Sequence, residues 1–161
     1  MLVGVLSDTH DRLPLIAKAL DVFRRQGVDV VIHAGDIVSP FAAKTLKRIE
    51  SRCPLHVVYG NNEGESAGLS AILPQIQRGP IRLELDGRRI LVHHFDRWCD
   101  PADVVWADVI VTGHTHEVVN EVRNGRLFLN PGECCGWVKG RCTVALLETA
   151  GPSARIIELE P

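Results

Sequence analysis

The sequence predicts an α/β fold in which two mixed β-sheets pack together and are flanked by helices. In the first half, apolar strands alternate with helices, a pattern that connects parallel strands. In the second half, short strands are joined by tight turns such as Asp86-Gly87 and Asn124-Gly125, which are typical of hairpins. The 161 residues fit a single domain, residues 1–161, and are enough to bury a core without disulfides.

The first half reads as alternating strands and helices, each with its own end signals. Pro14 suits the first turn of a helix and Gly27 suits its end. Between residues 64 and 79 the pattern is less regular, with some helical spacing from Leu69 to Leu73. The expected order is a strand over 2–6, a helix from Asp11-Arg12-Leu13-Pro14 to Gly27, a strand over 28–33, a helix over 40–52 and a strand over 55–59.

The second half is dominated by short strands. The expected order is a hairpin of strands 81–85 and 90–93, a helix over 101–106, a strand over 109–112, a hairpin of strands 118–122 and 127–129, and closing strands over 143–147 and 155–159. Together with the first half, this order predicts sheets packed in layers with helices on the outside.

Composition limits the classes of partner and compartment. The formal net charge of −2 offers no electrostatic reason to bind nucleic acid or an anionic membrane. We expect no signal peptide and no membrane span, and therefore a soluble cytoplasmic protein. The five cysteines lack a C-x-x-C pair and are expected to be reduced thiols. The sequence leaves the oligomeric state open, with a homo-oligomer as one alternative.

Five polar segments each follow an apolar strand. They are Asp8-Thr9-His10, Gly35-Asp36, Gly60-Asn61-Asn62-Glu63, His93-His94 and Gly113-His114-Thr115-His116. Strand ends on one edge of a sheet lie close together, so these side chains are expected at a common rim. Nitrogen and oxygen ligands of this kind suit Mn²⁺, Fe, Co²⁺, Ni²⁺ or Zn²⁺. The segments supply two Asp, one Asn and four or five His side chains as candidate ligands. Seven ligands are too many for one tetrahedral ion and suit two divalent ions that share a carboxylate.

This ordered set resembles the calcineurin-like metallophosphoesterase superfamily. The short length and the Asn130-Pro131-Gly132 stretch resemble its small prokaryotic phosphodiesterase branch, to which the retromer scaffold subunit of eukaryotes is related. The resemblance covers nearly the whole chain and implies a four-layer α/β sandwich. It also implies hydrolysis of a small phosphate ester by a metal-bridging hydroxide.

The resemblance assigns a role to each matching residue. Asp8, His10 and His116 would hold one metal ion. Asn61, His93 and His114 would hold the other, with Asn61 also close to the substrate. Asp36 would bridge both ions.

Three positions depart from the pattern of the family. Asn62 stands where an acid for the leaving group is common, so diesters or activated esters are expected to be better substrates. His94 replaces a glycine and is a candidate proton donor, although alternation along the strand would turn it away from His93. Glu133 follows Asn-Pro-Gly in place of serine, where it would narrow access to the site or repel an anion.

Other functions and roles remain open from the sequence. A non-catalytic metal-binding interaction scaffold of the same fold is the main alternative to an enzyme, and a thiol enzyme would rest only on Cys134-Cys135. His33 and His56 are expected to be structural. The three tryptophans are expected to pack in the core or at the rim, with a pocket wall as the alternative for one of them.

Overall fold

The computed structural model describes all 161 residues and contains two five-stranded sheets. The first sheet has the strand order β10-β9-β1-β2-β3 and the second has the order β4-β5-β6-β8-β7. The strands are β1 (Leu2–Leu6), β2 (Val30–His33), β3 (Leu55–Val57), β4 (Ile81–Leu85), β5 (Arg88–Val92), β6 (Val109–Val111), β7 (Val118–Arg123), β8 (Arg126–Pro131), β9 (Thr143–Glu148) and β10 (Ser153–Glu158). The helices are α1 (Leu13–Gln26), α2 (Pro40–Lys47), α3 (Ser66–Ile72) and α4 (Pro101–Trp106), with 3-10 turns η1 (Arg48–Ser51) and η2 (Asp96–Trp98).

Both sheets are mixed, as the sequence predicts. Strands β1, β2 and β3 run parallel, whereas β9 is antiparallel to β1 and to β10. In the second sheet, β5, β6 and β8 run parallel, and the outer strands β4 and β7 are antiparallel to their neighbours. The parallel strands of each sheet therefore end together at one edge, where their following loops can meet.

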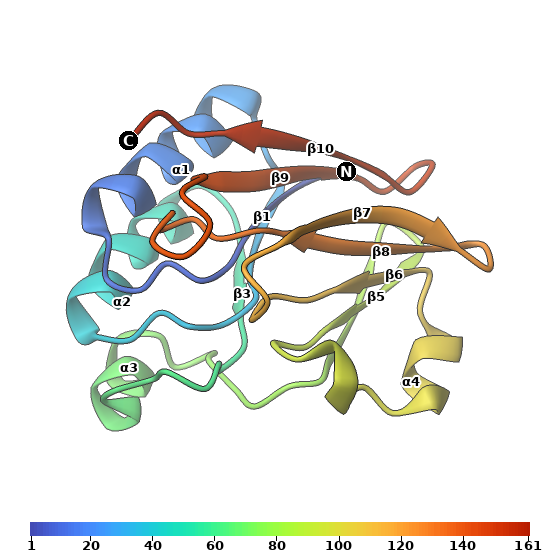
Figure 1. Cartoon of the computed structure of the whole chain (residues 1–161), viewed down its shortest axis with the longest axis horizontal. Helices are drawn as coiled ribbons and strands as arrows, with labels where there is room; N and C mark the ends of the chain where they lie inside the picture. The colour runs from blue at the N-terminus through green and yellow to red at the C-terminus, as the bar shows by residue number, and fades with distance from the viewer.

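The layers are held together by three apolar clusters. The largest lies between the first sheet and helices α1, α2 and α3 (Figure 1). A second lies between the two sheets and includes Val3 and Ile32 from the first sheet with Ile90 and Val92 from the second. A small third cluster packs α4 against the outer face of the second sheet through Leu91 and Ile110. The order of layers is helices, sheet, sheet, helix, which is the predicted α/β sandwich.

Helix α1 shows how the sequence pattern sets an element. Its buried side chains recur at helical spacing and include Leu15, Ala19 and Phe23, so one face packs on the first sheet. Pro14 lies in its first turn. Gly27 ends it in the left-handed region at φ 68°, a conformation that glycine adopts without steric penalty.

Several predicted boundaries differ from the structure. The helix expected over 40–52 is α2 followed by the tighter turn η1, before Cys53-Pro54. Ser39 caps α2 by accepting a hydrogen bond from the Phe41 amide, 3.3 Å. Strand β5 ends at Val92 rather than at residue 93, so the two histidines that follow lie beyond the regular strand.

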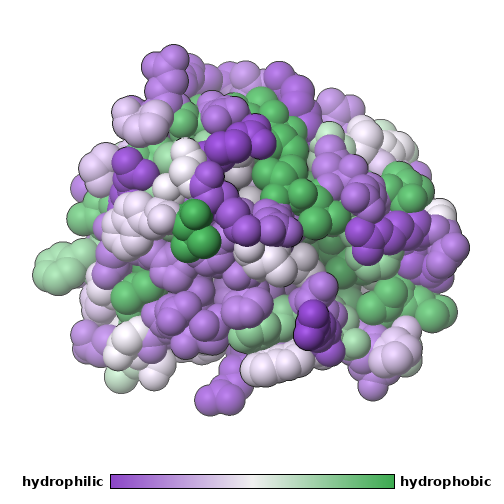
Figure 2. Space-filling model, viewed as in Figure 1, coloured by the Kyte–Doolittle hydropathy of each residue, from purple (hydrophilic) through white to green (hydrophobic).

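No helix is both long enough and apolar enough to cross a membrane. On the face drawn in Figure 2, hydrophilic residues predominate and hydrophobic residues lie between them in smaller groups. The large hydrophobic side chains that are exposed come from separate parts of the chain, including Phe41, Trp98, Val122 and Trp137.

Candidate metal centre

Loops from both sheets meet at one rim of the sandwich and are joined by backbone hydrogen bonds. The Asp8 amide donates to the carbonyl of Gly35, 3.0 Å, which links the loops after β1 and β2. The Gly113 amide donates to the carbonyl of His94, 3.1 Å, which links the loops after β6 and β5. The His114 amide donates to the Asp8 carboxylate, 3.1 Å, and so joins the two sheets. Four of the five polar segments predicted to share a rim are thus joined there.

Five of the candidate residues have left-handed backbone conformations. Their φ angles are 51° at Asp8, 39° at His10, 61° at Asp36, 67° at His114 and 59° at His116. Such conformations are uncommon outside glycine and concentrate at functional sites, where surrounding contacts hold them. The loops thus hold unfavourable backbone geometry at the residues that carry the candidate chemistry.

One group of ligand atoms comes from Asp8, His10, Asp36 and His116, all within 4.8 Å of one another. His10 Nε2 lies 3.4 Å from Asp36 Oδ2, and His116 Nε2 lies 3.3 Å from Asp8 Oδ1. Asp8 Oδ1 and His10 Nε2 are buried and have no hydrogen-bond partner. Buried polar atoms in proteins are normally paired, so a cation held here would supply the partner that both atoms lack.

A second group lies beside the first. Asn61 Oδ1 is 2.9 Å from His114 Nδ1 and 3.0 Å from His94 Nε2. Neighbouring ligands of an octahedral ion with bonds of about 2.1 Å lie about 3 Å apart, which is the spacing of these atoms. Asp36 contacts both groups, because its Oδ1 is 3.5 Å from His94 Nε2 while its Oδ2 faces His10. The residues present therefore fit two divalent ions on either side of one carboxylate.

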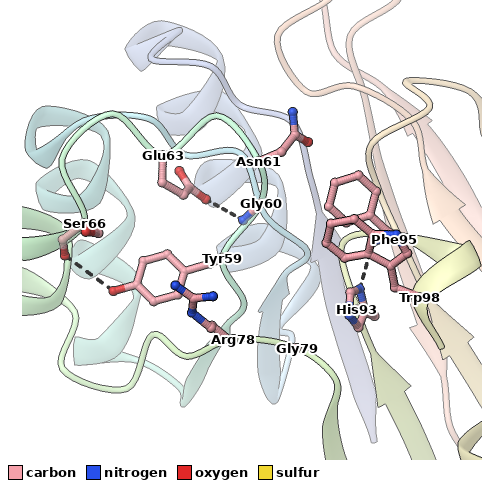
Figure 3. A pocket seen from close by; sticks show the side chains of 10 residues that line it. All are labelled: Tyr59, Gly60, Asn61, Glu63, Ser66, Arg78, Gly79, His93, Phe95 and Trp98. Atoms are coloured by element: carbon pink, nitrogen blue, oxygen red, sulfur yellow. Dashed lines mark hydrogen bonds between the residues drawn. The ribbon is translucent and has the colours of Figure 1, made fainter. Parts of the chain in front are cut away.

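The structure reverses the expected placement of the two neighbouring histidines. His93 Nδ1 accepts a hydrogen bond from the Phe95 amide, 2.9 Å, and its ring lines a neighbouring cavity (Figure 3). His94 is fully buried and faces Asn61 and Asp36 instead. The reason lies in β5, where Ile90 and Val92 face the first sheet and Leu91 faces α4. Alternation continued past the strand puts His94, and not His93, on the side of the first sheet.

The environment of His94 also sets the form of its ring. The carbonyl of Ala34 lies 2.7 Å from Nδ1, so Nδ1 carries a proton and Nε2 is directed at Asn61 and Asp36. Burial lowers the pKa of His94, but its hydrogen bond and charge interaction with Asp36 outweigh burial, and the pKa is raised overall. A cation at this position would displace a proton from Nε2.

Asn62 lies against Asp36. Its backbone amide donates to Asp36 Oδ1, 2.9 Å, and its side-chain amide donates to Oδ2, 2.8 Å. Burial alone would raise the pKa of Asp36, but the hydrogen bonds from His94 and Asn62 hold it well below its ordinary value. Asn62 thus helps to keep this carboxylate ionised.

Glu133 is buried and does not face an opening to the site, contrary to the expectation that it would narrow access or repel an anion. Its Oε2 accepts a hydrogen bond from His116 Nδ1, 2.7 Å, and its carboxylate also accepts from the Val138 and Lys139 amides. Because this oxygen accepts, the proton of the His116 ring lies on Nδ1, and Nε2 is left available toward Asp8. Sequence reasoning missed the role, although an acid directly after Asn-Pro-Gly in an apolar stretch is a signal that could have been used.

The remaining candidates have structural roles. Both ring nitrogens of His33 are used, by the Thr9 hydroxyl at 3.0 Å and the Gly35 amide at 3.2 Å. Cys135 is buried near His10 and His116, and burial raises the pKa of its thiol to about 12. It is therefore a protonated thiol at neutral pH, which argues against the alternative of a thiol nucleophile.

Glu63 supports the loops beside the site and belongs to neither ligand group. Its carboxylate accepts hydrogen bonds from the amides of Asp36, Ile37, Val38 and Gly60, at 2.8–3.0 Å. It therefore ties the loop after β2 to the loop after β3. Gly60 is needed at this junction because a Cβ there would overlap the carboxylate of Asp36.

Comparison with known proteins gives consistent results. The model of the calcineurin-like phosphoesterase superfamily domain matches residues 1–151. Phosphodiesterase MJ0936 of Methanocaldococcus jannaschii is 36% identical, over 99% of this chain and 100% of that protein. A probable metallophosphoesterase of Methanothermobacter thermautotrophicus is 32% identical, over 82% of this chain and 76% of that protein.

Solved structures give the same fold. The structure of an archaeal phosphodiesterase superposes with a TM-score of 0.85 at 35% identity, covering 99% of this chain and 100% of that chain. Vps29 of Entamoeba histolytica complexed with zinc has a TM-score of 0.71 at 18% identity, covering 98% of this chain and 99% of that one. At that identity the second likeness shows only the fold.

Proposed function

The chain belongs to the calcineurin-like phosphoesterase superfamily as a phosphoric ester hydrolase, and we propose that it hydrolyses phosphodiesters with two divalent metal ions. The observation that carries the proposal is the pair of ligand groups that share Asp36, each with atoms spaced for one ion. When bound, such a pair of ions polarises the phosphoryl oxygens and lowers the pKa of a water molecule so that hydroxide is available near neutral pH.

Each ligand has a role that follows from its contacts. Asp8, His10 and His116 would hold the first ion, and Asn61, His94 and His114 the second, with Asp36 between them. This set differs from the one implied by the resemblance at one position, because His94 takes the place of His93. The nitrogen and oxygen donors suit Mn²⁺, Fe, Co²⁺, Ni²⁺ or Zn²⁺.

The residues around the site favour diesters over monoesters. The backbone amide and the side-chain amide of Asn62 each donate to Asp36, and an amide is not an acid near neutral pH. His94 would be occupied as a ligand and could not also protonate a leaving group. Esters whose alcohols depart without a proton, or that carry one negative charge instead of two, are therefore the better substrates.

The intact ligand set also favours an enzyme over a metal-binding scaffold. Every position in the two groups holds a side chain with a donor atom of the right kind, and two of those atoms are buried without a partner. A protein used only as an interaction surface would not need to maintain this polar, strained arrangement.

The test is hydrolysis of bis(4-nitrophenyl) phosphate and of 4-nitrophenyl phosphate, assayed with Mn²⁺ and with Ni²⁺. The wild type is expected to hydrolyse the diester faster in a metal-dependent reaction. His94→Ala and Asp36→Ala are each expected to lower kcat/KM by about 100-fold or more, since each removes a metal ligand.

His93→Ala is the matched control, because it removes the neighbouring imidazole that does not face either ligand group. Its effect on metal affinity, measured by calorimetry, is expected to stay within about threefold, against a loss of about 100-fold for His94→Ala. The opposite ranking of the two variants would contradict the ligand assignment. Bound metal without turnover of either ester would favour the scaffold.

A further inference from the structure

A cavity opens directly beside the second ligand group and shares Asn61 with it. Its volume is about 660 Å³, within the range of pockets that take small organic ligands. Figure 3 shows Tyr59 and Arg78 on one side of it, with His93, Phe95 and Trp98 on the other. A substrate whose phosphorus lies near Asn61 could therefore extend one of its two arms into this space.

One wall of the cavity is aromatic and continuous with the metal centre. The rings of Phe95 and Trp98 stack with centroids 4.0 Å apart and planes 28° apart. Phe95 also lies 4.3 Å from the ring of His114, measured between centroids. Trp98 is 66% exposed, so it presents indole surface that the protein itself does not cover. Such a surface binds planar rings by stacking.

The other lining groups supply positive charge and a hydrogen-bond donor. Arg78 is exposed and forms no ion pair or hydrogen bond within the chain. The only acidic lining residue, Glu63, has its carboxylate engaged by four backbone amides. His93 accepts a hydrogen bond at Nδ1, so the proton of its neutral ring is on Nε2, which has no partner in the protein. The cavity is thus aromatic on one side and cationic on the other.

We propose that this cavity binds the non-leaving arm of a phosphodiester whose arm carries a planar aromatic ring and a second anionic group, as a nucleotide does. The ring stacks on the exposed indole of Trp98, which Phe95 supports from its other face, and the second anion pairs with Arg78. This inference rests on the proposed function, because the arm enters the cavity from a phosphate held at the metal centre. It makes Trp98 and Arg78 specificity-determining residues for the reaction.

The first test uses two diesters with the same leaving group, thymidine 5′-(4-nitrophenyl phosphate) and methyl 4-nitrophenyl phosphate, with Mn²⁺-loaded protein. The wild type is expected to prefer the thymidine ester by about tenfold or more in kcat/KM, mainly through KM. Trp98→Ala is expected to remove most of this preference while the methyl ester changes less than about twofold. Phe41→Ala, which removes an exposed aromatic ring on α2, is expected to leave the preference unchanged. Equal losses on both esters in Trp98→Ala would overturn the inference.

The second test measures binding by calorimetry, independently of turnover. Mn²⁺-loaded wild type is expected to bind thymidine 3′,5′-bisphosphate about tenfold more tightly than thymidine 5′-monophosphate. Arg78→Gln is expected to abolish this difference. Arg52→Gln, which changes an exposed arginine that precedes β3 and does not line this cavity, is expected to keep it. Equal affinities in the wild type would overturn the role of Arg78.

The two proposals fail in different ways. If neither ester is hydrolysed with Mn²⁺ or Ni²⁺, the proposed function fails, and the calorimetric comparison still decides whether the cavity binds the nucleotide. If both esters are hydrolysed at equal rates and Trp98→Ala changes neither, the hydrolase stands and the cavity is not a binding site for a ring-bearing arm.

Discussion

At the scale of single residues, the proposed metal ligands depend on partners that orient them. Glu133 holds His116 through Nδ1, and the Ala34 carbonyl holds His94 in the same way. In each case Nδ1 donates its proton to the partner oxygen, and Nε2 is directed at the centre. Such partners fix both the tautomer and the angle of the ring, which is why their loss weakens metal binding.

Glu133→Gln tests this dependence. The amide can still accept from the Val138 and Lys139 amides, but it lacks the charge that stabilises His116 as a donor at Nδ1. We expect the dissociation constant for Mn²⁺ to rise about 10–100-fold, measured by calorimetry. Glu117→Gln is the matched control, because Glu117 forms only an exposed ion pair with Lys139 and its loss should not alter metal binding. Equal effects of the two substitutions would contradict the role of Glu133.

His33 gives a prediction about pH. Burial, followed by the nearby charge of His94, lowers the pKa of His33 to about 3 from an ordinary value of 6.5. Between these pH values the unfolded chain binds a proton that the folded protein does not, so the free energy of unfolding falls as pH falls from 6.5 toward 3. Protonation of this one group lowers the free energy of unfolding by up to about 1.4 kcal/mol for each unit by which the pH falls.

The measurement is urea denaturation of metal-free protein between pH 6.5 and 4.5. His33→Gln is expected to be less stable than wild type at pH 7, because Thr9 and the Gly35 amide lose a well-placed partner. Its stability should nevertheless fall less steeply with acid, since the group that takes up the proton is gone. An unchanged slope would show that His33 is not neutral in the folded protein.

At the scale of elements, the site is made by loops that follow parallel strands. The loops after β2 and β3 are joined by Glu63, whose carboxylate satisfies four amides, including those of Asp36 and Gly60. Without this carboxylate the four amides would lack a partner, and Asp36 would lose the support of its own backbone. Unpaired amides cost roughly 1–3 kcal/mol each when buried, although solvent can reach part of this loop.

Glu63→Ala is therefore expected to lower the free energy of unfolding by about 1–3 kcal/mol and to weaken metal binding as well. Urea denaturation and metal titration measure the two effects. Glu65→Ala, two residues along the same loop, removes an exposed side chain that caps no amide and should change neither. Loss of stability with metal affinity intact would mean that Glu63 supports the fold but not the position of Asp36.

Strand β5 shows why the sequence alone could not predict which histidine enters the site. The hairpin around Asp86-Gly87 could be predicted, as could the arrival of two histidines at its end. Which histidine enters the centre depends on which face of β5 meets the first sheet, and that face is set by the packing of Ile90 and Val92 against it. An apolar strand buried on both faces carries no alternation that could reveal this choice.

At the scale of the whole molecule, the fold gathers buried charge at the rim where loops of the two sheets meet. Asp8 and Asp36 are both almost fully buried, and burial raises the pKa of Asp8. Two carboxylates in one small volume repel each other unless cations lie between them. Part of the stability of the folded protein therefore depends on the ions that the site would hold.

Metal addition is accordingly expected to stabilise the protein. At 100 times the dissociation constant, an ion bound only by the folded state adds about 2.7 kcal/mol, or about 5–10 °C in Tm for a chain of this length. Differential scanning fluorimetry with Mn²⁺ and with chelator measures the shift. Asp36→Asn, which removes the shared carboxylate charge, is expected to shift by less than half as much. An equal shift in that variant would argue against Asp36 as the bridge.

By itself, the sequence determined the order of strands and helices, the mixed sheets and the five polar segments at their ends, because periodicity, turn residues and chain order are local properties. Only the tertiary structure decided which of His93 and His94 faces the centre, that Glu133 orients His116, and that Arg78 and Trp98 face one cavity. These facts depend on how surfaces distant in the chain pack against one another. No local pattern encodes that packing, because each contact joins residues whose separation in sequence is unrelated to their separation in space.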